Sequence, residues 1–149
     1  MSYSKDPMFL RSIIMQHYDQ PNNKIEQKPD QSYTSYQNKS ATCIDDITVH
    51  IKLEDNKIFD ILFSGIGCAI STSSTDIVSS LTKNKSISES LIIIENYLKM
   101  VDGQEYDESL LDELIAFYKI NEQPNRLRCA KIGVLAIYNC LKEMNNNGN

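Results

Sequence analysis

The side chains best suited to chemistry in this sequence are its four cysteines, at positions 43, 68, 129 and 140. Cys43, Cys68 and Cys129 fall at the expected ends of secondary-structure elements, where side chains from distant segments can meet. Asp45 lies two residues after Cys43. Three thiolates and a carboxylate suit a tetrahedral zinc ion or an iron–sulfur cluster. The predicted ligands of one common site are Cys43, Asp45, Cys68 and Cys129.

The charge of this ligand set indicates a working site rather than a structural one. Four anionic ligands around a divalent ion leave about two net negative charges, and Arg126, Arg128 and Lys131 beside Cys129 could offset them. Structural zinc sites favour closed sets of soft ligands held by closely spaced Cys-x-x-Cys pairs. Because these ligands come from distant segments and one is a hard oxygen, we expect a site in which a ligand can exchange.

Other interpretations of the same residue types remain open. Four scattered cysteines can also be buried thiols without a common site, since free cysteine is often simply packed. Cys140, near Ile137 on the same expected helix as Cys129, is assigned to that class. Neither histidine has ligand spacing. His17 is expected on an amphipathic helix, and His50 on the outward face of a strand.

The composition restricts the class of protein. With 149 residues, 41% hydrophobic and 23% charged, the chain is expected to form one domain over residues 1–149. A net charge of -5 argues against nucleic acid as a partner. No apolar run approaches the ~20 residues of a membrane span, and the first residues lack the layout of a secretory signal. We therefore expect a cytoplasmic protein with no membrane partner and with reduced cysteines.

Periodicity predicts an α+β fold with an N-terminal helix, a small antiparallel sheet of about three strands, and several C-terminal helices packed against it. The expected helices cover residues 6–18, 71–82, 87–100, 105–120 and 125–142. Strands are expected at 47–53 and 58–64, joined as a hairpin, with a short strand at 33–36. Residues 71–74 are expected to cap and solvate their helix, residues 102–113 to form a solvated helix start, and residues 144–149 to form a frayed tail.

Cys68 stands at the corner between the second expected strand and the following helix. Gly65 and Gly67 precede it and permit an unusual backbone there. A thiol at a helix N-terminus is biased toward thiolate, the form that binds metal or attacks sulfur. The corner is therefore expected to hold Cys68 as a fixed ligand, while Cys43 lies on a looser segment.

At these residues the sequence resembles the U-type iron–sulfur cluster assembly scaffold family, the IscU/NifU-like proteins. The stretch from Gly65 to Ser71 resembles the motif of the family's second cysteine. The separations of 25 residues from Cys43 to Cys68 and of 61 residues from Cys68 to Cys129 are also similar, the second being longer than in IscU. The extra segment, about residues 103–123, and the sequence Arg126-Leu127-Arg128-Cys129 are similar to the SufU branch.

This resemblance implies zinc binding and the acceptance of persulfide sulfur from a cysteine desulfurase of the SufS/IscS/NifS type. Cys43 would be the sulfur acceptor, with Asp45, Cys68 and Cys129 as the remaining metal ligands. Arg126 would steady the thiolate or persulfide charge. In IscU-type members the same ligands would hold iron in a nascent [2Fe–2S] cluster. Where the family has glycine after its first cysteine, this chain has Ile44, which could reorient Asp45.

Three functions follow as hypotheses. The first is a zinc-dependent sulfurtransferase that serves a cysteine desulfurase and, beyond it, the iron–sulfur assembly machinery or apo-protein acceptors. The second is a scaffold on which a [2Fe–2S] cluster is assembled and passed on. The third is a non-catalytic, metal-stabilised interaction module, suggested by Ile44.

Overall fold

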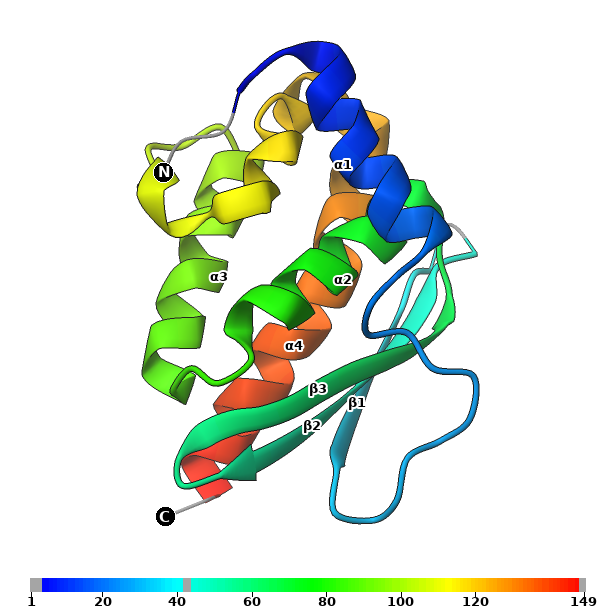
Figure 1. Ribbon diagram of the computed structural model, residues 1–149, viewed down its shortest axis with the longest axis vertical. Coiled ribbons are helices and arrows are strands. Elements are labelled where there is room, and N and C mark those ends of the chain that lie inside the picture. Colours follow the sequence, from blue (N-terminus) through cyan, green and yellow to red (C-terminus); the bar gives the residue numbers. More distant parts are fainter. Residues whose placement is uncertain (1–3, 42–43, 148–149) are drawn as a thin grey trace.

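Three antiparallel strands form the sheet on which the rest of the chain packs. The computed structural model describes residues 4–41 and 44–147. Strands β1 (Thr34–Lys39), β2 (Asp46–Glu54) and β3 (Lys57–Ile66) lie in the order β1-β2-β3 (Figure 1). The helices are α1 (Pro7–Asp19), α2 (Ala69–Thr82), α3 (Ile87–Val101) and α4 (Leu127–Asn147). The predicted α+β class, with its N-terminal helix and antiparallel sheet, is confirmed.

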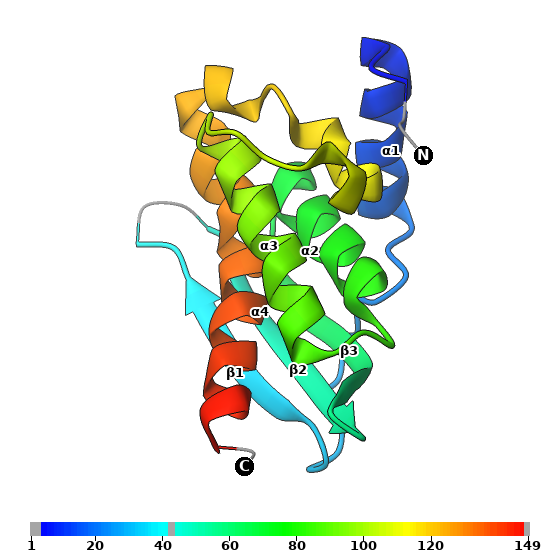
Figure 2. The same ribbon diagram turned by 90° about the vertical axis from the view of Figure 1, so that its left-hand side faces the viewer.

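The helices lie on one side of the sheet. Helix α4 contacts β1 and β2, and α2 contacts β3, while α3 packs on α2 and α4 further from the strands (Figure 2). Alternate residues of β2, namely Ile47, Val49 and Ile51, are fully buried against them. Val49 pairs with Phe63 of β3, which is also buried. This alternation fixes the register, because a slip by one residue would turn the apolar side chains away from the helices.

The edge of β3 is covered by the chain that follows α1. The Ile25 N–H donates to the Phe63 carbonyl over 2.8 Å, and the Phe63 N–H donates to the Asn23 carbonyl over 3.0 Å. The chain then reaches β1, which is longer than the predicted strand at 33–36 because it pairs with β2 as far as Lys39. The chain after α1 thus covers the outer edge of β3, and the longer β1 covers the edge of β2; both edges would otherwise be open.

His50 alternates with Val49 and Ile51 and so lies on the face of the sheet away from the helices, as predicted, but it is buried there rather than exposed to solvent. Its ring lies between two serine hydroxyls of the neighbouring strands, with Nδ1 2.7 Å from Ser35 Oγ and Nε2 3.0 Å from Ser64 Oγ. Burial lowers the pKa of His50, and the charge of Lys28 lowers it further. The hydroxyls on both sides explain how a polar ring can be buried here without an ionic partner.

Helix α2 is buried on nearly every side. Its serines and threonines are buried too, so the prediction that residues 71–74 are solvated is wrong. Their hydroxyls donate to carbonyls one turn earlier, as from Thr75 to Ser71 over 2.7 Å and from Ser79 to Thr75 over 2.8 Å. These bonds satisfy the hydroxyls inside the protein. Small side chains also let α4 approach closely: a Cβ added at Gly133 would lie 1.7 Å from Thr75 Oγ1.

The segment between α3 and α4 is not the helix predicted at 105–120. It forms four short 3-10 helices: η1 (Glu108–Leu110), η2 (Asp112–Phe117), η3 (Ile120–Glu122) and η4 (Pro124–Arg126). Asp112, at the start of η2, has a positive φ of 51°, which interrupts the continuous α-helix that was predicted across this position. The apolar spacing that suggested a helix is still used, because Leu111, Leu114 and Phe117 are buried.

Helix α4 also differs from its predicted bounds. It begins at Leu127, after the 3-10 turn at Pro124, and it continues to Asn147. Residues 144–147 are therefore helical where the sequence predicted a frayed tail. No helix in the part of the chain that the structure describes is long and apolar enough to cross a bilayer.

A buried ionic cluster joins α1 to α2 and η2. His17 Nδ1 lies 2.6 Å from Asp76 Oδ2, and His17 Nε2 lies 3.0 Å from Glu113 Oε1. Asp76 is fully buried and also accepts from the backbone N–H groups of Asn22 and Asn23. Glu113, predicted to lie in a solvated helix start, is half-buried in this contact. Burial lowers the pKa of His17, but its bonds to Asp76 and Glu113 outweigh this and leave the pKa raised.

We predict that this cluster makes stability depend on pH. Because the pKa of His17 is raised in the folded state, its contribution is complete below the pKa of about 6.5 in the unfolded chain and is lost as pH rises through the folded value. Urea unfolding should therefore show the wild type losing stability as the pH rises above about 6.5. His17→Gln should be less stable by about 1–3 kcal/mol at pH 6 and should show a flatter profile. Parallel profiles for the two proteins would contradict this role.

Candidate metal centre

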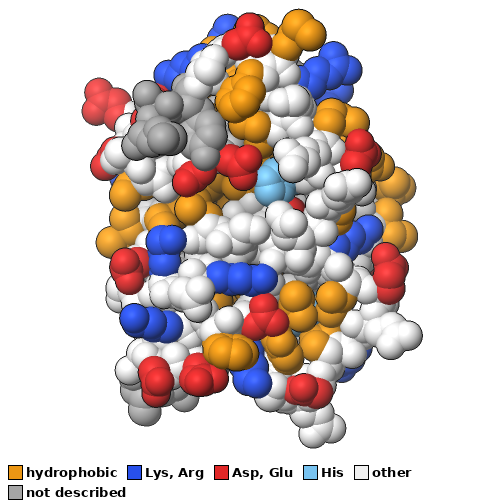
Figure 3. All heavy atoms as spheres, in the orientation of Figure 1, with side chains coloured by type: hydrophobic (Ala, Val, Ile, Leu, Met, Phe, Trp, Pro, Cys, Tyr) orange, Lys and Arg blue, Asp and Glu red, His pale blue; other side chains and the backbone are white. Residues whose placement is uncertain are grey.

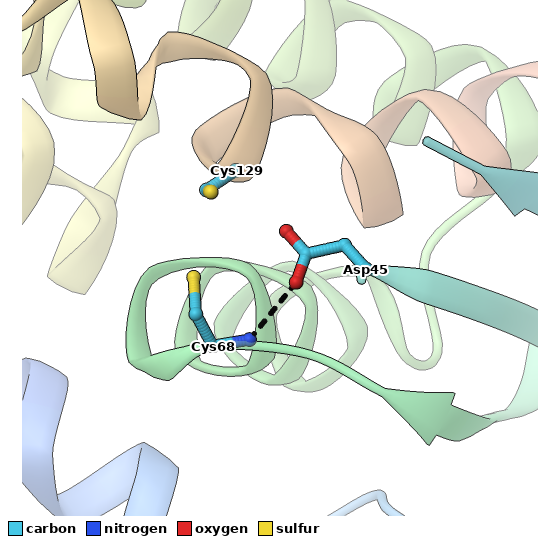
Figure 4. A group of neighbouring side chains, drawn as sticks. All are labelled: Asp45, Cys68 and Cys129. Carbon is cyan, nitrogen blue, oxygen red and sulfur yellow. Dashed lines mark hydrogen bonds between the residues drawn. The ribbon is translucent and has the colours of Figure 1, made fainter. Parts of the chain in front are cut away.

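Three potential metal ligands meet where β2, α2 and α4 begin. Asp45 lies directly before β2, Cys68 directly before α2, and Cys129 in the first turn of α4. One ligand atom from each lies within 4.8 Å of the other two (Figure 4). The structure thus brings together three of the four residues predicted from the sequence. The fourth, Cys43, lies outside the described residues.

The glycine corner places Cys68 through close backbone contacts. Gly65 has a φ of +114°, and a Cβ there would lie 2.0 Å from the Asp46 carbonyl oxygen. A Cβ at Gly67 would lie 2.5 Å from Ser71 Oγ. Glycine is therefore required at Gly65 by both space and backbone conformation, whereas a side chain at Gly67 would displace the Ser71 hydroxyl. Cys68 then serves as the N-cap of α2, as its position in the sequence predicted.

Ser71 supports the Cys68 sulfur and was not predicted to do so. Its backbone N–H lies 3.5 Å and its hydroxyl 3.6 Å from Cys68 Sγ. Both groups can donate a hydrogen bond to the sulfur and so hold it in position. The signal was present in the sequence, because a hydroxyl residue three positions after a capping residue faces the cap.

The surroundings of the Asp45 carboxylate are those of a group that binds a metal ion. Its side chain is 2% exposed, and Oδ1 accepts from the Cys68 N–H over 3.1 Å. Oδ2 is buried and has no hydrogen-bond partner among residues 4–41 and 44–147. Leaving a buried carboxylate oxygen unpaired is costly. A metal ion beside Cys68 and Cys129 would satisfy it, so the residues present fit such an ion.

Ile44 does not turn Asp45 away from the cysteines. Its side chain is 76% exposed and points away from the interior, while Asp45 reaches Cys68 and Cys129. The reorientation anticipated for this departure from the family pattern is therefore not found at Asp45.

The proton affinity of Cys129 is high in this cluster. Burial raises the pKa of Cys129 well above its usual range, and the neighbouring Cys68 and Asp45 raise it further. Acidic groups this close disfavour simultaneous ionisation. A metal ion reverses that balance by favouring the ionised ligands, so its binding should release protons.

The three basic residues beside Cys129 differ in their surroundings. Lys131 forms an ion pair with Asp102 over 2.5 Å, so its charge is largely engaged away from the site. Arg126 and Arg128 are exposed on η4 and on the first turn of α4.

Cys140 lies apart from this cluster, as predicted. It is 1% exposed, with its sulfur 3.8 Å from the Thr34 carbonyl oxygen and 3.9 Å from Met144 Sδ. Burial raises its pKa to about 12, so it is a packed thiol rather than a nucleophile. The histidines also take no part in the site, in agreement with their spacing.

The family of the protein follows from its sequence and fold together. The NifU-like N-terminal domain family matches residues 10–136. The chain belongs to this family, the U-type iron–sulfur scaffold family that the cysteine pattern resembles.

Individual relatives and structures agree with this membership. The chain is 32% identical over 128 residues to the zinc-dependent sulfurtransferase SufU of Bacillus subtilis, covering 85% of each chain. It is 28% identical over 121 residues to the iron–sulfur cluster assembly scaffold protein IscU of Thermotoga maritima, covering 81% of this chain and 85% of the relative.

A crystal structure of a protein from Fervidobacterium islandicum superimposes with a TM-score of 0.78 at 28% identity. The match covers 93% of this chain and 96% of that one, and its name describes an iron–sulfur cluster assembly scaffold protein for the SUF system.

We predict that Asp45 is a ligand of a bound zinc ion. Asp45→Asn keeps the size of the side chain but removes its negative charge, and zinc affinity should fall at least about tenfold. Competition with a coloured chelator measures this affinity, and zinc should raise the melting temperature of the wild type more than that of the variant. The matched control is Asp46→Asn, because the neighbouring Asp46 carboxylate binds Gln37 instead. Equal zinc affinity in the two variants would remove Asp45 from the ligand set.

Proposed function

We propose that the protein is a zinc-dependent sulfurtransferase that accepts persulfide sulfur from a cysteine desulfurase and supports iron–sulfur cluster biogenesis. The observation that carries the proposal is the meeting of Asp45, Cys68 and Cys129, where one buried oxygen of the Asp45 carboxylate has no partner among the described residues. The similarity to the Bacillus subtilis zinc-dependent sulfurtransferase over most of both chains supports the choice of zinc and of sulfur transfer.

Four residues would hold the zinc ion in this proposal: Cys43, Asp45, Cys68 and Cys129. When bound, the ion would keep the thiols deprotonated and masked at neutral pH. Asp45 and Cys68 are fixed to one another by a backbone hydrogen bond, and Cys68 is fixed further by the glycine corner. These constraints favour Asp45, Cys68 and Cys129 as permanent ligands and Cys43 as the residue that reacts.

The sulfur-transfer step needs no external oxidant or reductant. The Cys43 thiolate attacks the outer sulfur of the desulfurase persulfide, forming a new sulfur–sulfur bond at Cys43. The sulfur–sulfur bond of the donor breaks, and its electron pair leaves with the donor cysteine as a thiolate. Cys43 then carries the persulfide, and the total number of thiols and persulfides is unchanged.

Arg126 is assigned the stabilisation of negative charge during this transfer. Its guanidinium is exposed on η4, three residues before Cys129. An exposed cation this close to Cys129 in the chain can approach a thiolate or persulfide without being buried itself. It can also favour encounter with an anionic sulfur donor.

Cluster assembly on the same ligands is the second candidate function. Three thiolates and a carboxylate also suit iron, and a [2Fe–2S] core can bind cysteine ligands. The similarity to the IscU scaffold protein of Thermotoga maritima favours this possibility. The two functions differ in what the site carries at the end of a turnover: a persulfide on Cys43 or an assembled cluster.

We predict that Cys43→Ala abolishes the stimulation of a cysteine desulfurase while the fold and the buried ligands remain. The wild type should bind about one zinc ion per chain and increase sulfide release in the presence of a reductant. Cys140→Ala is the matched control, because that buried thiol lies apart from the ligands and its loss should leave stimulation intact. Mass spectrometry should find added sulfur on Cys43 alone. Full stimulation by Cys43→Ala, with only its stability changed, would favour a non-catalytic interaction module.

Anaerobic reconstitution separates the two candidate functions. For a sulfurtransferase we predict that iron, cysteine and a desulfurase leave the zinc protein without the visible absorption of a [2Fe–2S] cluster. A stable visible spectrum that is lost in Cys68→Ser would instead establish the scaffold function. Metal analysis before and after the reaction shows whether iron has replaced zinc.

A further inference from the structure

A groove of about 480 Å³ lies between α1 and the 3-10 segment formed by η2, η3 and η4. Its walls carry residues of α1, such as Leu10 and Met15, and residues of the 3-10 segment, such as Phe117 and Ile120. Ala69 and Ile70, at the start of α2, also line it. Figure 2 shows the arrangement of these elements, with α1 and the segment that leads into α4 at the same end of the molecule.

The charge lining this groove is opposite to that of the whole protein. Lys5, Arg11, Lys119 and Arg126 line it, and no aspartate or glutamate does, whereas the chain has 20 acidic and 15 basic residues. Such a separation of charge favours a negatively charged ligand. In the space-filling view, hydrophobic side chains lie next to Lys and Arg side chains at the upper end of the molecule (Figure 3).

Two of these cations are available to a ligand. Lys5 already binds Glu108 over 2.8 Å, and Lys119 lies over the Tyr118 ring. For Arg11 and Arg126, no ion pair is found among residues 4–41 and 44–147. Both guanidinium groups are exposed on opposite walls, so carboxylates along the groove could bind each without displacing an internal partner.

The groove also offers apolar surface. Met15 is 39% exposed although it lies on a helix packed against the core, and the half-buried Ile14 lines the same wall. Methionine adapts its shape to different apolar partners, so it is common on surfaces that bind peptides. Leu10 and Phe117 are buried beneath them and give the groove a rigid floor.

The groove ends beside the candidate metal centre. Ala69 directly follows Cys68, and Arg126 lies three residues before Cys129. The residues of a partner segment bound in the groove would therefore lie beside the metal ligands, and the partner chain could continue from there toward them.

We propose that this groove is the docking site for an acidic segment of a partner protein that carries apolar residues between its carboxylates. Cations on both walls and an apolar floor between them match such a segment better than a small anion, which would reach one wall and leave the floor uncovered. The groove is lined by none of the candidate metal ligands, so the binding requires neither the metal ion nor the sulfur chemistry proposed above.

The test uses a fluorescein-labelled peptide of alternating leucine and glutamate, with fluorescence anisotropy on the full chain. Binding should weaken as the salt concentration rises. Arg11→Ala combined with Arg126→Ala should weaken it about tenfold, as expected for the loss of two ligand ion pairs. The matched control is Lys24→Ala combined with Lys99→Ala, which removes the same charge from exposed positions outside the groove and should bind like the wild type.

Two further peptides separate docking from general charge attraction. A peptide of alternating serine and glutamate should bind at least about tenfold more weakly, because it leaves the apolar floor uncovered. A leucine–lysine peptide should not bind. Absence of binding by the leucine–glutamate peptide would overturn the proposal, as would equal binding of the serine peptide or equal loss in the two double variants. Because metal-free protein should bind equally well, failure here is distinguishable from failure of the sulfur-transfer assay.

Discussion

The hydrogen bond from the Cys68 backbone N–H to Asp45 joins the end of the strand pair to the start of the central helix. It fixes one carboxylate oxygen and thereby aims the other into a space with no protein partner among the described residues. The bond depends on Gly65 and Gly67, because side chains there would collide with the backbone of β2 and with Ser71. The positions of Asp45 and Cys68 at the metal centre therefore depend on the backbone geometry of residues 65–68.

The opposite side of helix α2 is held by charge rather than by backbone constraint. His17 bridges Asp76 and Glu113, so α1 and the 3-10 segment are both attached to the helix that carries Cys68. Buried ionic contacts of this kind are weak sources of net stability but strongly resist rearrangement, since separating one partner leaves a buried charge. The helix is thus positioned from both sides, and its N-terminal thiol has little freedom to move.

Residue types and element ends were sufficient to predict much of this site. The three described ligands were found because each stands at a boundary that periodicity marks, such as the glycine corner before Cys68. Contacts between distant segments were not predictable. The partner of His17 is 59 residues away, and the hydroxyls around His50 come from two other strands. Apolar spacing also gave the wrong element at 105–120, because it reports which residues are buried but not the positive φ of Asp112.

The contact between Gly133 and Thr75 joins the two helices that start at the metal centre. Thr75 lies two turns into α2 from Cys68, and Gly133 lies one turn into α4 from Cys129. A single methyl group at position 133 would collide with Thr75, so the two helices can pack this closely only because residue 133 has no side chain. Gly133 therefore helps to keep the starts of α2 and α4, and with them Cys68 and Cys129, near one another although it lies outside the ligand set.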